Sequence, residues 1–115
     1  RPWLSADLLE RVLAAAARHG ACVPVLEAAE AVKEVDPGTA FVRRHLPRHS
    51  IMLAQTPQGF AYREILAAHE KAHADGLCFV DDAEVFDRFA GPVTWLPGDP
   101  ANRKITIAAD LEDDA

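Results

Sequence analysis

The first twenty positions of the chain place apolar residues at a helical spacing. The residues that share one helical face are Leu8, Leu9, Val12, Leu13 and Ala16. Ser5 stands where a side chain can cap the first turn, and Gly20 follows the last periodic position, where helices commonly stop. The pattern therefore predicts an amphipathic helix that starts after Ser5 and stops at Gly20.

Two different strand patterns follow this helix. Residues 21–29, ACVPVLEAA, form a short apolar run that predicts a buried strand. Residues 31–50 carry two polar, weakly apolar arms on either side of Asp36-Pro37-Gly38, a sequence typical of a tight turn. They predict a hairpin with too few apolar residues for a core of its own. We expect it to lean on another surface, for which a partner subunit is one candidate.

The middle of the chain combines a continuous apolar run with a helical pattern. Residues 51–54 are apolar at consecutive positions, which is typical of a strand covered on both faces, as in a parallel sheet. A helix is predicted from about Tyr62 to Asp75, with Gly76 as its stop.

The last third of the chain predicts one more helix and two more strands. The helix begins at Asp81 or Asp82, with Glu84 as a capping-box partner. Residues 91–100 and 103–111 are the strand candidates, and the acidic end of the chain is expected to be solvated. The order of all these elements predicts an α/β layer fold.

Composition and charge narrow the possible partners. The chain has 115 residues, half of them hydrophobic, which is typical of one globular domain or part of one. Its formal net charge of −6 opposes general binding to nucleic acid or to an anionic membrane, because both need a positive field. No apolar run reaches the roughly 18 residues of a membrane-spanning helix. We therefore expect a cytoplasmic protein without nucleic-acid or membrane partners.

The cysteines and the first residue add two further expectations. Cys22 and Cys78 each stand in a short apolar stretch and form no C-x-x-C pair, so we expect two buried free thiols rather than a disulfide. The sequence starts at Arg1 rather than at Met, and a fragment, a processed piece or an incomplete sequence is therefore expected.

A zinc motif is present in the sequence but lacks a third ligand. His69-Glu70-x-x-His73 matches the H-E-x-x-H signature of zinc hydrolases, but Phe79 stands where the extended signature has its last histidine. The same histidines share a helical stripe with Ile65, Leu66 and Ala72. We expect this stripe to be a half-buried helix face and assign no metal ligand in the chain.

Cations and hydroxyls gather at the predicted element ends: Arg1, Arg43, Arg44, Arg48, Thr56, Arg103, Lys104 and Thr106. Ligands of open α/β sheets bind at strand ends. Thr56 and Lys104 are therefore expected at the mouth of a site.

Several segments in a fixed order resemble one enzyme family. They are RPWLSADLLERVLAAAARHGA, AVKEVD, AQTPQGF, ILAAHEKAHADG, DDAEVF and NRKIT. Together they resemble the C-terminal half of 2-C-methyl-D-erythritol 4-phosphate cytidylyltransferase. TPQGF and NRKIT are the most specific, and the opening RP is similar to the end of the family's D-A-A-R-P segment. The family's glycine-rich nucleotide loop would lie upstream of Arg1.

The resemblance implies a fold, a reaction and partners. The fold is Rossmann-like, of the nucleotidyltransferase type, with a β-arm at about residues 30–50 that clasps a second subunit, so a homodimer is expected. Residues 1–115 would be the C-terminal part of a single cytidylyltransferase domain. The reaction moves CMP from CTP to the polyol phosphate with Mg²⁺ and releases diphosphate, in the non-mevalonate route to isoprenoid precursors. The fragment alone is expected to be inactive.

The resemblance also assigns residues. Arg48 and Lys104 match the arm arginine and the late lysine that place the sugar phosphate, and they are the catalytic candidates. Arg1 and Thr56 match substrate-binding positions. This assignment is chemically sound, because catalysis between two anionic substrates is mostly positioning and charge neutralisation. Arginine offers the phosphate a planar fork, and lysine offers a point charge.

Two positions depart from the family pattern. Ala31 and Val80 stand where the family commonly has threonine, so two hydroxyls that could contact the polyol are missing. A different acceptor, such as ribitol 5-phosphate, is therefore one alternative. A non-catalytic dimerisation module that uses the hairpin is the other.

Overall fold

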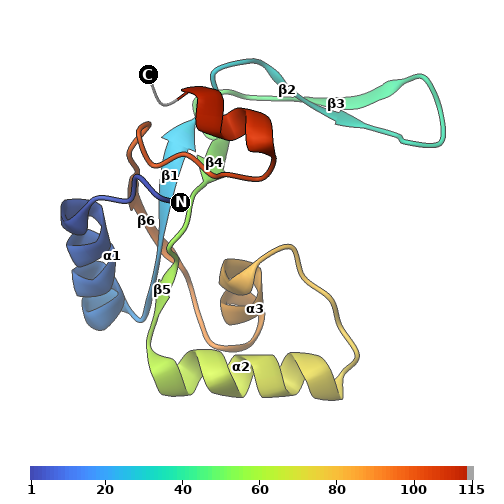
Figure 1. Cartoon of the computed structure of the whole chain (residues 1–115). Coiled ribbons are helices and arrows are strands. Elements are labelled where there is room, and N and C mark those ends of the chain that lie inside the picture. The colour runs from blue at the N-terminus through green and yellow to red at the C-terminus, as the bar shows by residue number, and fades with distance from the viewer. Residues whose placement is uncertain (114–115) are drawn as a thin grey trace.

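The computed structural model describes residues 1–113, and these form an α/β fold around a mixed sheet (Figure 1). The predicted α/β class is thereby confirmed. In chain order the elements are α1 (Ala6–His19), β1 (Ala21–Glu27), β2 (Val32–Val35), β3 (Val42–Leu46), β4 (Met52–Ala54), β5 (Gly59–Phe60), α2 (Tyr62–Ala74), α3 (Asp82–Phe89), β6 (Thr94–Pro97) and the 3-10 helix η1 (Ala108–Asp113).

Strand β1 is the centre of the sheet. It pairs antiparallel with β4 through Val25–Glu27 and with β5 through Ala21 and Cys22. On its other side it pairs parallel with β6, with Cys22 opposite Thr94. Four of its seven residues are buried with α1 packed against them, so β1 is the strand that organises the core.

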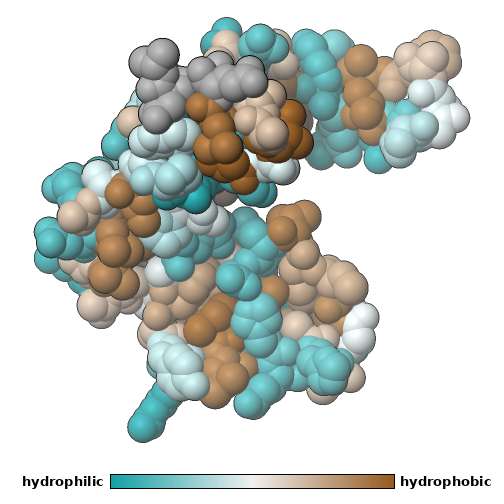
Figure 2. Space-filling view, in the orientation of Figure 1, coloured by the Kyte–Doolittle hydropathy of each residue, from teal (hydrophilic) through white to brown (hydrophobic). Residues whose placement is uncertain are grey.

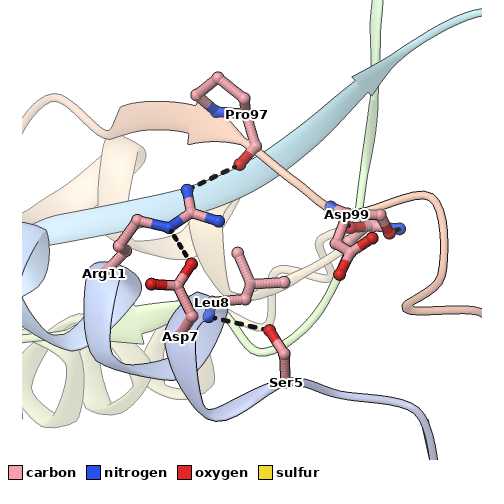
Figure 3. A network of polar contacts seen from close by, with 7 residues as sticks. Ser5, Asp7, Leu8, Arg11, Pro97 and Asp99 are labelled. Atoms are coloured by element: carbon pink, nitrogen blue, oxygen red, sulfur yellow. Dashed lines mark hydrogen bonds and ion pairs between the residues drawn. The ribbon is translucent and has the colours of Figure 1, made fainter.

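Helix α1 forms as its sequence pattern predicts. The Ser5 hydroxyl accepts a hydrogen bond from the Leu8 amide (3.0 Å), and Gly20 follows the helix with φ 94°, a conformation that glycine adopts without strain (Figure 3). Leu8, Val12 and Ala16 are buried. The buried stripe is narrower than predicted, because Leu13 is 57% exposed and Leu9 is also exposed.

A polar link ties α1 to the sheet. The Arg11 guanidinium donates to the Asp7 carboxylate (3.0 Å) and to the Pro97 carbonyl at the end of β6 (3.2 Å) (Figure 3). All three groups are accessible to water, so the link orients the helix more than it stabilises the fold.

The predicted hairpin is present. Strands β2 and β3 pair antiparallel, with an irregularity between Glu34 and Val35, and they project away from the sheet (Figure 1). In the turn, the Asp36 carboxylate accepts a hydrogen bond from the Gly38 amide (3.0 Å). Near the tip, Phe41 is 77% exposed. No element outside the hairpin packs extensively on it within the described chain.

Two strand predictions are wrong. Strand β4 is not a parallel strand covered on both faces: it pairs antiparallel with β1 alone, and Leu53 is 52% exposed. Residues 103–111 do not form a strand. The Asp110 carboxylate accepts hydrogen bonds from the amides of Thr106 (2.8 Å) and Ile107 (3.1 Å), which turns the backbone into η1.

The two middle helices form a second packing unit. Asp81 caps α3 by accepting from the Glu84 amide (2.9 Å), while the Glu84 carboxylate accepts from the Val80 amide (2.9 Å), one residue earlier than in the predicted capping box. The cluster between the helices contains Ala68, Ala72 and Val85, with Phe79 and Phe89 beside it. The predicted half-buried stripe is wrong in part, because Leu66, His69 and His73 are exposed and the buried face runs through the alanines.

The acidic end of the chain lies partly in η1, which reaches Asp113. The last two residues fall outside the described part of the structure.

Candidate active site

Two buried amide side chains join the end of β4 to the loop after β6. Gln55 follows β4, and its side-chain oxygen accepts from the Asp99 amide (3.0 Å). Its side-chain nitrogen donates to the carbonyls of Asp99 (3.0 Å) and Asn102 (3.1 Å). Three hydrogen bonds from one side chain therefore fix the loop against the strand.

Gly98 leaves the space that this amide occupies. A Cβ at this position would overlap the Gln55 side-chain oxygen, and the Gly98 amide donates to the Val25 carbonyl (2.8 Å). Asp99 comes directly after it, beyond the end of β6 (Figure 3). The loop thus passes close to the sheet because position 98 has no side chain.

Asn102 is the second buried amide. It is fully buried, and its side-chain nitrogen donates to the Thr56 carbonyl (2.8 Å). Its backbone amide donates to the Asp99 carbonyl (2.9 Å). Its side-chain oxygen is buried and has no hydrogen-bond partner among the described residues.

Arg1 and Thr56 lie on this frame. The Arg1 Nε donates to the Thr56 hydroxyl (2.6 Å), and another guanidinium nitrogen donates to the backbone carbonyl of Asn102. Partial burial lowers the pKa of Arg1, yet arginine stays charged at any physiological pH. The structure therefore brings together the two residues that the sequence assigned to substrate binding.

Lys104 lies two residues beyond Asn102 and is exposed. It makes no hydrogen bond or ion pair with the residues described here. The neighbouring Arg103 places its guanidinium over the Trp3 ring, 4.5 Å from the ring centre. An ammonium group exposed to water two residues beyond Asn102 can contact an incoming anion.

Arg48 lies at the base of the hairpin, and within the described part of the chain it shares no hydrogen bond with the Arg1–Thr56 pair. Its guanidinium donates to the carbonyls of Ala28 (3.3 Å) and Ala29 (3.0 Å), just after β1. Among the described residues, no hydrogen bond connects it to Arg1, Thr56 or Lys104.

The other two hairpin arginines pair within the hairpin. Arg43 lies 3.6 Å from the Glu34 carboxylate, and Arg44 donates to the same group. Of the three arginines of the hairpin, Arg48 is thus the one bonded to the body of the domain.

The surface is hollowed between the hairpin and the lobe of α2 and α3 (Figure 2). A shallow cavity of the chain is lined by Thr56, Pro57, Gln58, Asp81 and Asp82. Gln58 closes it on one side by donating to the Asp81 carboxylate (3.1 Å) and accepting from the Ala83 amide (3.1 Å).

The two positions that depart from the family pattern are both exposed. Val80 is 88% exposed and lies directly before the cavity residue Asp81. Ala31 lies between the end of β1 and the start of the hairpin. Neither side chain supports the fold, so each is free to vary with the ligand.

The histidines of the zinc motif have other surroundings. His69 contacts the Asp82 carboxylate (2.9 Å), and both groups are exposed. Among the side chains that the structure describes, there is no cluster of three or more His, Cys, Asp or Glu that could hold a metal ion.

The cysteine prediction is half right. Both thiols are free, and burial raises the pKa of Cys22, but Cys78 is exposed rather than buried. It lies in the loop after α2, where Phe79 packs beside the cluster and Leu77, Cys78 and Val80 are exposed. None of the described helices is long and apolar enough to cross a membrane.

Comparison with known proteins decides the family. The sequence model of the family 2-C-methyl-D-erythritol 4-phosphate cytidylyltransferase matches residues 1–114. The chain belongs to this family. Among curated cytidylyltransferases, that of Acidobacterium capsulatum is 36% identical over 97% of the chain. A bifunctional enzyme IspD/IspF of Rhizobium rhizogenes is 42% identical over 96% of it.

Solved cytidylyltransferases share the fold. The Thermus thermophilus enzyme aligns with a TM-score of 0.83 at 38% identity, covering 97% of this chain and 54% of that one. The 4-diphosphocytidyl-2C-methyl-D-erythritol synthase of Anaerococcus prevotii aligns with a TM-score of 0.87 at 28% identity, covering 97% and 52%. The chain spans 48% of the Acidobacterium relative and 28% of the bifunctional one.

Two residues of the candidate site, Gln55 and Asn102, were not singled out from the sequence. Gln55 directly precedes TPQGF and Asn102 is the first residue of NRKIT, and these positions are the signal that could have drawn attention to them. No local pattern predicts that an amide will be buried, because its partners come from segments more than 40 residues away.

Proposed function

We propose that the protein containing this chain transfers CMP from CTP to 2-C-methyl-D-erythritol 4-phosphate. The products would be a CDP-polyol and diphosphate, on the non-mevalonate route to isoprenoid precursors. The observation that carries the proposal is the Arg1–Thr56 pair on its buried amide frame, with Lys104 exposed two residues beyond Asn102, in a chain of the cytidylyltransferase family.

The reaction is a phosphoryl-type substitution at the α-phosphorus of CTP. A phosphate oxygen of the acceptor forms a bond to this phosphorus, and the bond to the bridging oxygen of the diphosphate breaks. Diphosphate leaves with the electron pair. Because both reactants are anions, the protein contributes mainly by neutralising charge and holding the two phosphates in line.

The cations of this chain take distinct parts in that task. Lys104 offers a point charge to the acceptor phosphate, and Arg48 offers a planar fork to it. Arg1 and Thr56 hold substrate beside them, with the guanidinium already held by the Thr56 hydroxyl and the Asn102 backbone carbonyl. Arg48 bonds backbone carbonyls in the free chain and would exchange them for phosphate oxygens on binding.

Magnesium belongs to the proposal as an ion carried by the nucleotide. Mg²⁺ keeps several waters and is commonly bound through substrate phosphates and one or two carboxylates. The proposed site residues are cations, a hydroxyl and amides, and no cluster of metal-ligating groups is found among the described side chains. These residues therefore do not fit as a magnesium cage, and we assign them no metal-dependent step.

The hairpin supports a homodimer as the working form. It projects from the domain with Phe41, Val35 and Val42 exposed, and an isolated two-stranded hairpin is marginal in water. A second copy of the protein would cover these side chains. The two free cysteines are compatible with a reducing compartment, and we place the protein in the cytoplasm.

The test is diphosphate release by the full-length protein. CTP and Mg²⁺ are supplied with 2-C-methyl-D-erythritol 4-phosphate, with ribitol 5-phosphate, or with no acceptor. Release with the first acceptor alone is the expected result. Release with ribitol 5-phosphate alone would mean that Ala31 and Val80 mark a different acceptor. Release with neither would favour the dimerisation module.

A further inference from the structure

Arg1, Thr56 and Asn102 form a closed ring of hydrogen bonds. Arg1 donates to the Thr56 hydroxyl and to the Asn102 carbonyl, and the Asn102 side chain donates to the Thr56 carbonyl (2.8 Å). Among the described residues, the Arg1 side chain therefore hydrogen-bonds Thr56 and Asn102. A long arginine side chain has many rotamers, and such contacts restrict it to one.

Within this ring the roles are unequal. Thr56 is exposed and Arg1 is half-buried, so both are accessible to a ligand. Asn102 is fully buried, donates its backbone amide to Asp99 and accepts from the Gln55 side chain. A fixed, inaccessible residue beneath two accessible ones is the arrangement that preorganises a binding site.

We propose that Asn102 is a positioning residue of the transferase site, holding Arg1 and Thr56 in the geometry that receives substrate. The inference rests on the proposed function for the identity of the reaction. Asn102 itself is too deeply buried to touch substrate.

The unpartnered oxygen of Asn102 argues against a purely stabilising role. A buried acceptor without a hydrogen bond lowers the stability of the fold, and native structures contain few such groups. An apolar side chain of similar size would fill the same space without that penalty. Such a side chain would not donate a hydrogen bond to the Thr56 carbonyl. A role in the site therefore explains the amide at position 102 better than the stability of the core does.

The experiment uses the full-length protein and three single variants, together with Thr56→Val alone and in combination with Asn102→Leu. Asn102→Leu keeps most of the volume but removes the donor, and Asn102→Ala serves where leucine does not fit. Val85→Ala, in the α2–α3 cluster, is the matched core control. Steady-state constants for CTP and acceptor, melting temperatures and crystal structures are measured for each.

The kinetic result separates positioning from general destabilisation. We expect Asn102→Leu to lower kcat/KM for the acceptor at least tenfold, while Val85→Ala lowers the melting temperature and leaves the kinetic constants unchanged. In the Thr56→Val background, the Asn102 change should lower kcat/KM for the acceptor by less than a further twofold, because both substitutions act on the Arg1–Thr56 pair. An Asn102→Leu enzyme within twofold of wild type, or losses that multiply in the double variant, would overturn the inference.

The crystal structures decide the inference even if the wild-type protein releases no diphosphate. That result would refute the proposed reaction but not the positioning role. Movement of the Arg1 guanidinium away from the Thr56 hydroxyl in both Asn102 variants, but not in Val85→Ala, supports the role. An unchanged Arg1–Thr56 hydrogen bond in the Asn102 variants contradicts it.

Discussion

The Arg1 guanidinium donates a 2.6 Å hydrogen bond to the Thr56 hydroxyl, across 55 positions of sequence. Arg1 precedes α1, and Thr56 follows β4, so the pair forms only when helix and sheet are packed. Both residues keep an accessible side, while the Asn102 side chain donates to the Thr56 carbonyl and the Gln55 side chain donates to the Asn102 backbone carbonyl. The two side chains are therefore held in one arrangement before a ligand binds, and they do not behave as two separate surface groups.

Removing the Thr56 hydroxyl tests whether this arrangement contributes to activity. Thr56→Val in the full-length enzyme should lower kcat/KM for the acceptor about tenfold, since hydrogen bonds to charged groups contribute about 1.5–3 kcal/mol and exposure places this one at the low end. Diphosphate release at varied acceptor concentration measures it. The matched control is Thr94→Val, whose hydroxyl bonds the Ala21 carbonyl inside the sheet. Equal kinetics for both variants would remove Thr56 from the site.

Larger losses of turnover are expected when either catalytic candidate is replaced. Arg48→Ala and Lys104→Ala should each reduce turnover roughly 10²- to 10³-fold, the range for losing one group that stabilises developing charge. Arg18→Ala, on the exposed side of α1, is the control and should keep full turnover. Turnover left intact by both Arg48→Ala and Lys104→Ala would defeat the proposed reaction mechanism.

Gly98 predicts a local steric effect. A Cβ there would overlap the Gln55 side-chain oxygen, so Gly98→Ala should destabilise the protein by about 1–3 kcal/mol, as overpacking generally does. Gly91→Ala is the control, because a Cβ at that position meets nothing within 4 Å. Thermal unfolding compares the two. Similar melting temperatures would show that Gln55 moves aside without loss.

The conformation of residues 106–113 is expected to depend on pH through the Asp110 carboxylate. Hydrogen bonds from the Thr106 and Ile107 amides lower the pKa of Asp110 from its ordinary value of 3.8. Its stabilising contribution is thus fully present above that value and is lost as the pH falls through the lower pKa of the folded state. An NMR titration of the Thr106 amide should follow this loss. An Asp110→Asn variant that titrates identically would exclude Asp110 as the cause.

The hairpin predicts a concentration-dependent dimer. Replacing Phe41 and Val42 with serine should weaken association of the full-length protein, because both side chains are exposed in the single chain. Sedimentation equilibrium measures the change. Leu13→Ser on α1 removes another exposed apolar side chain and should leave the mass unchanged. A dimer that survives deletion of residues 35–48 would rule out the hairpin as the contact.

Elements that depend on neighbouring residues could be predicted from the sequence alone. Helix α1 follows from its apolar spacing, the Ser5 cap and Gly20, and the hairpin turn follows from Asp36 and Gly38. Caps, turns and periodicity act within a few residues, so they are readable without the fold. The family segments TPQGF and NRKIT also pointed to Thr56 and Lys104 from the sequence.

The burial of these elements and the contacts between distant polar groups could be seen only in the folded structure. The apolar run of β4 gave no sign that the strand pairs with β1 alone, nor did residues 103–111 show that Asp110 would turn them into a 3-10 helix. The burial of Asn102 depends on partners far away in the chain. Burial and long-range hydrogen bonds arise from packing, and for that reason the frame beneath Arg1 and Thr56 could not be predicted from local sequence.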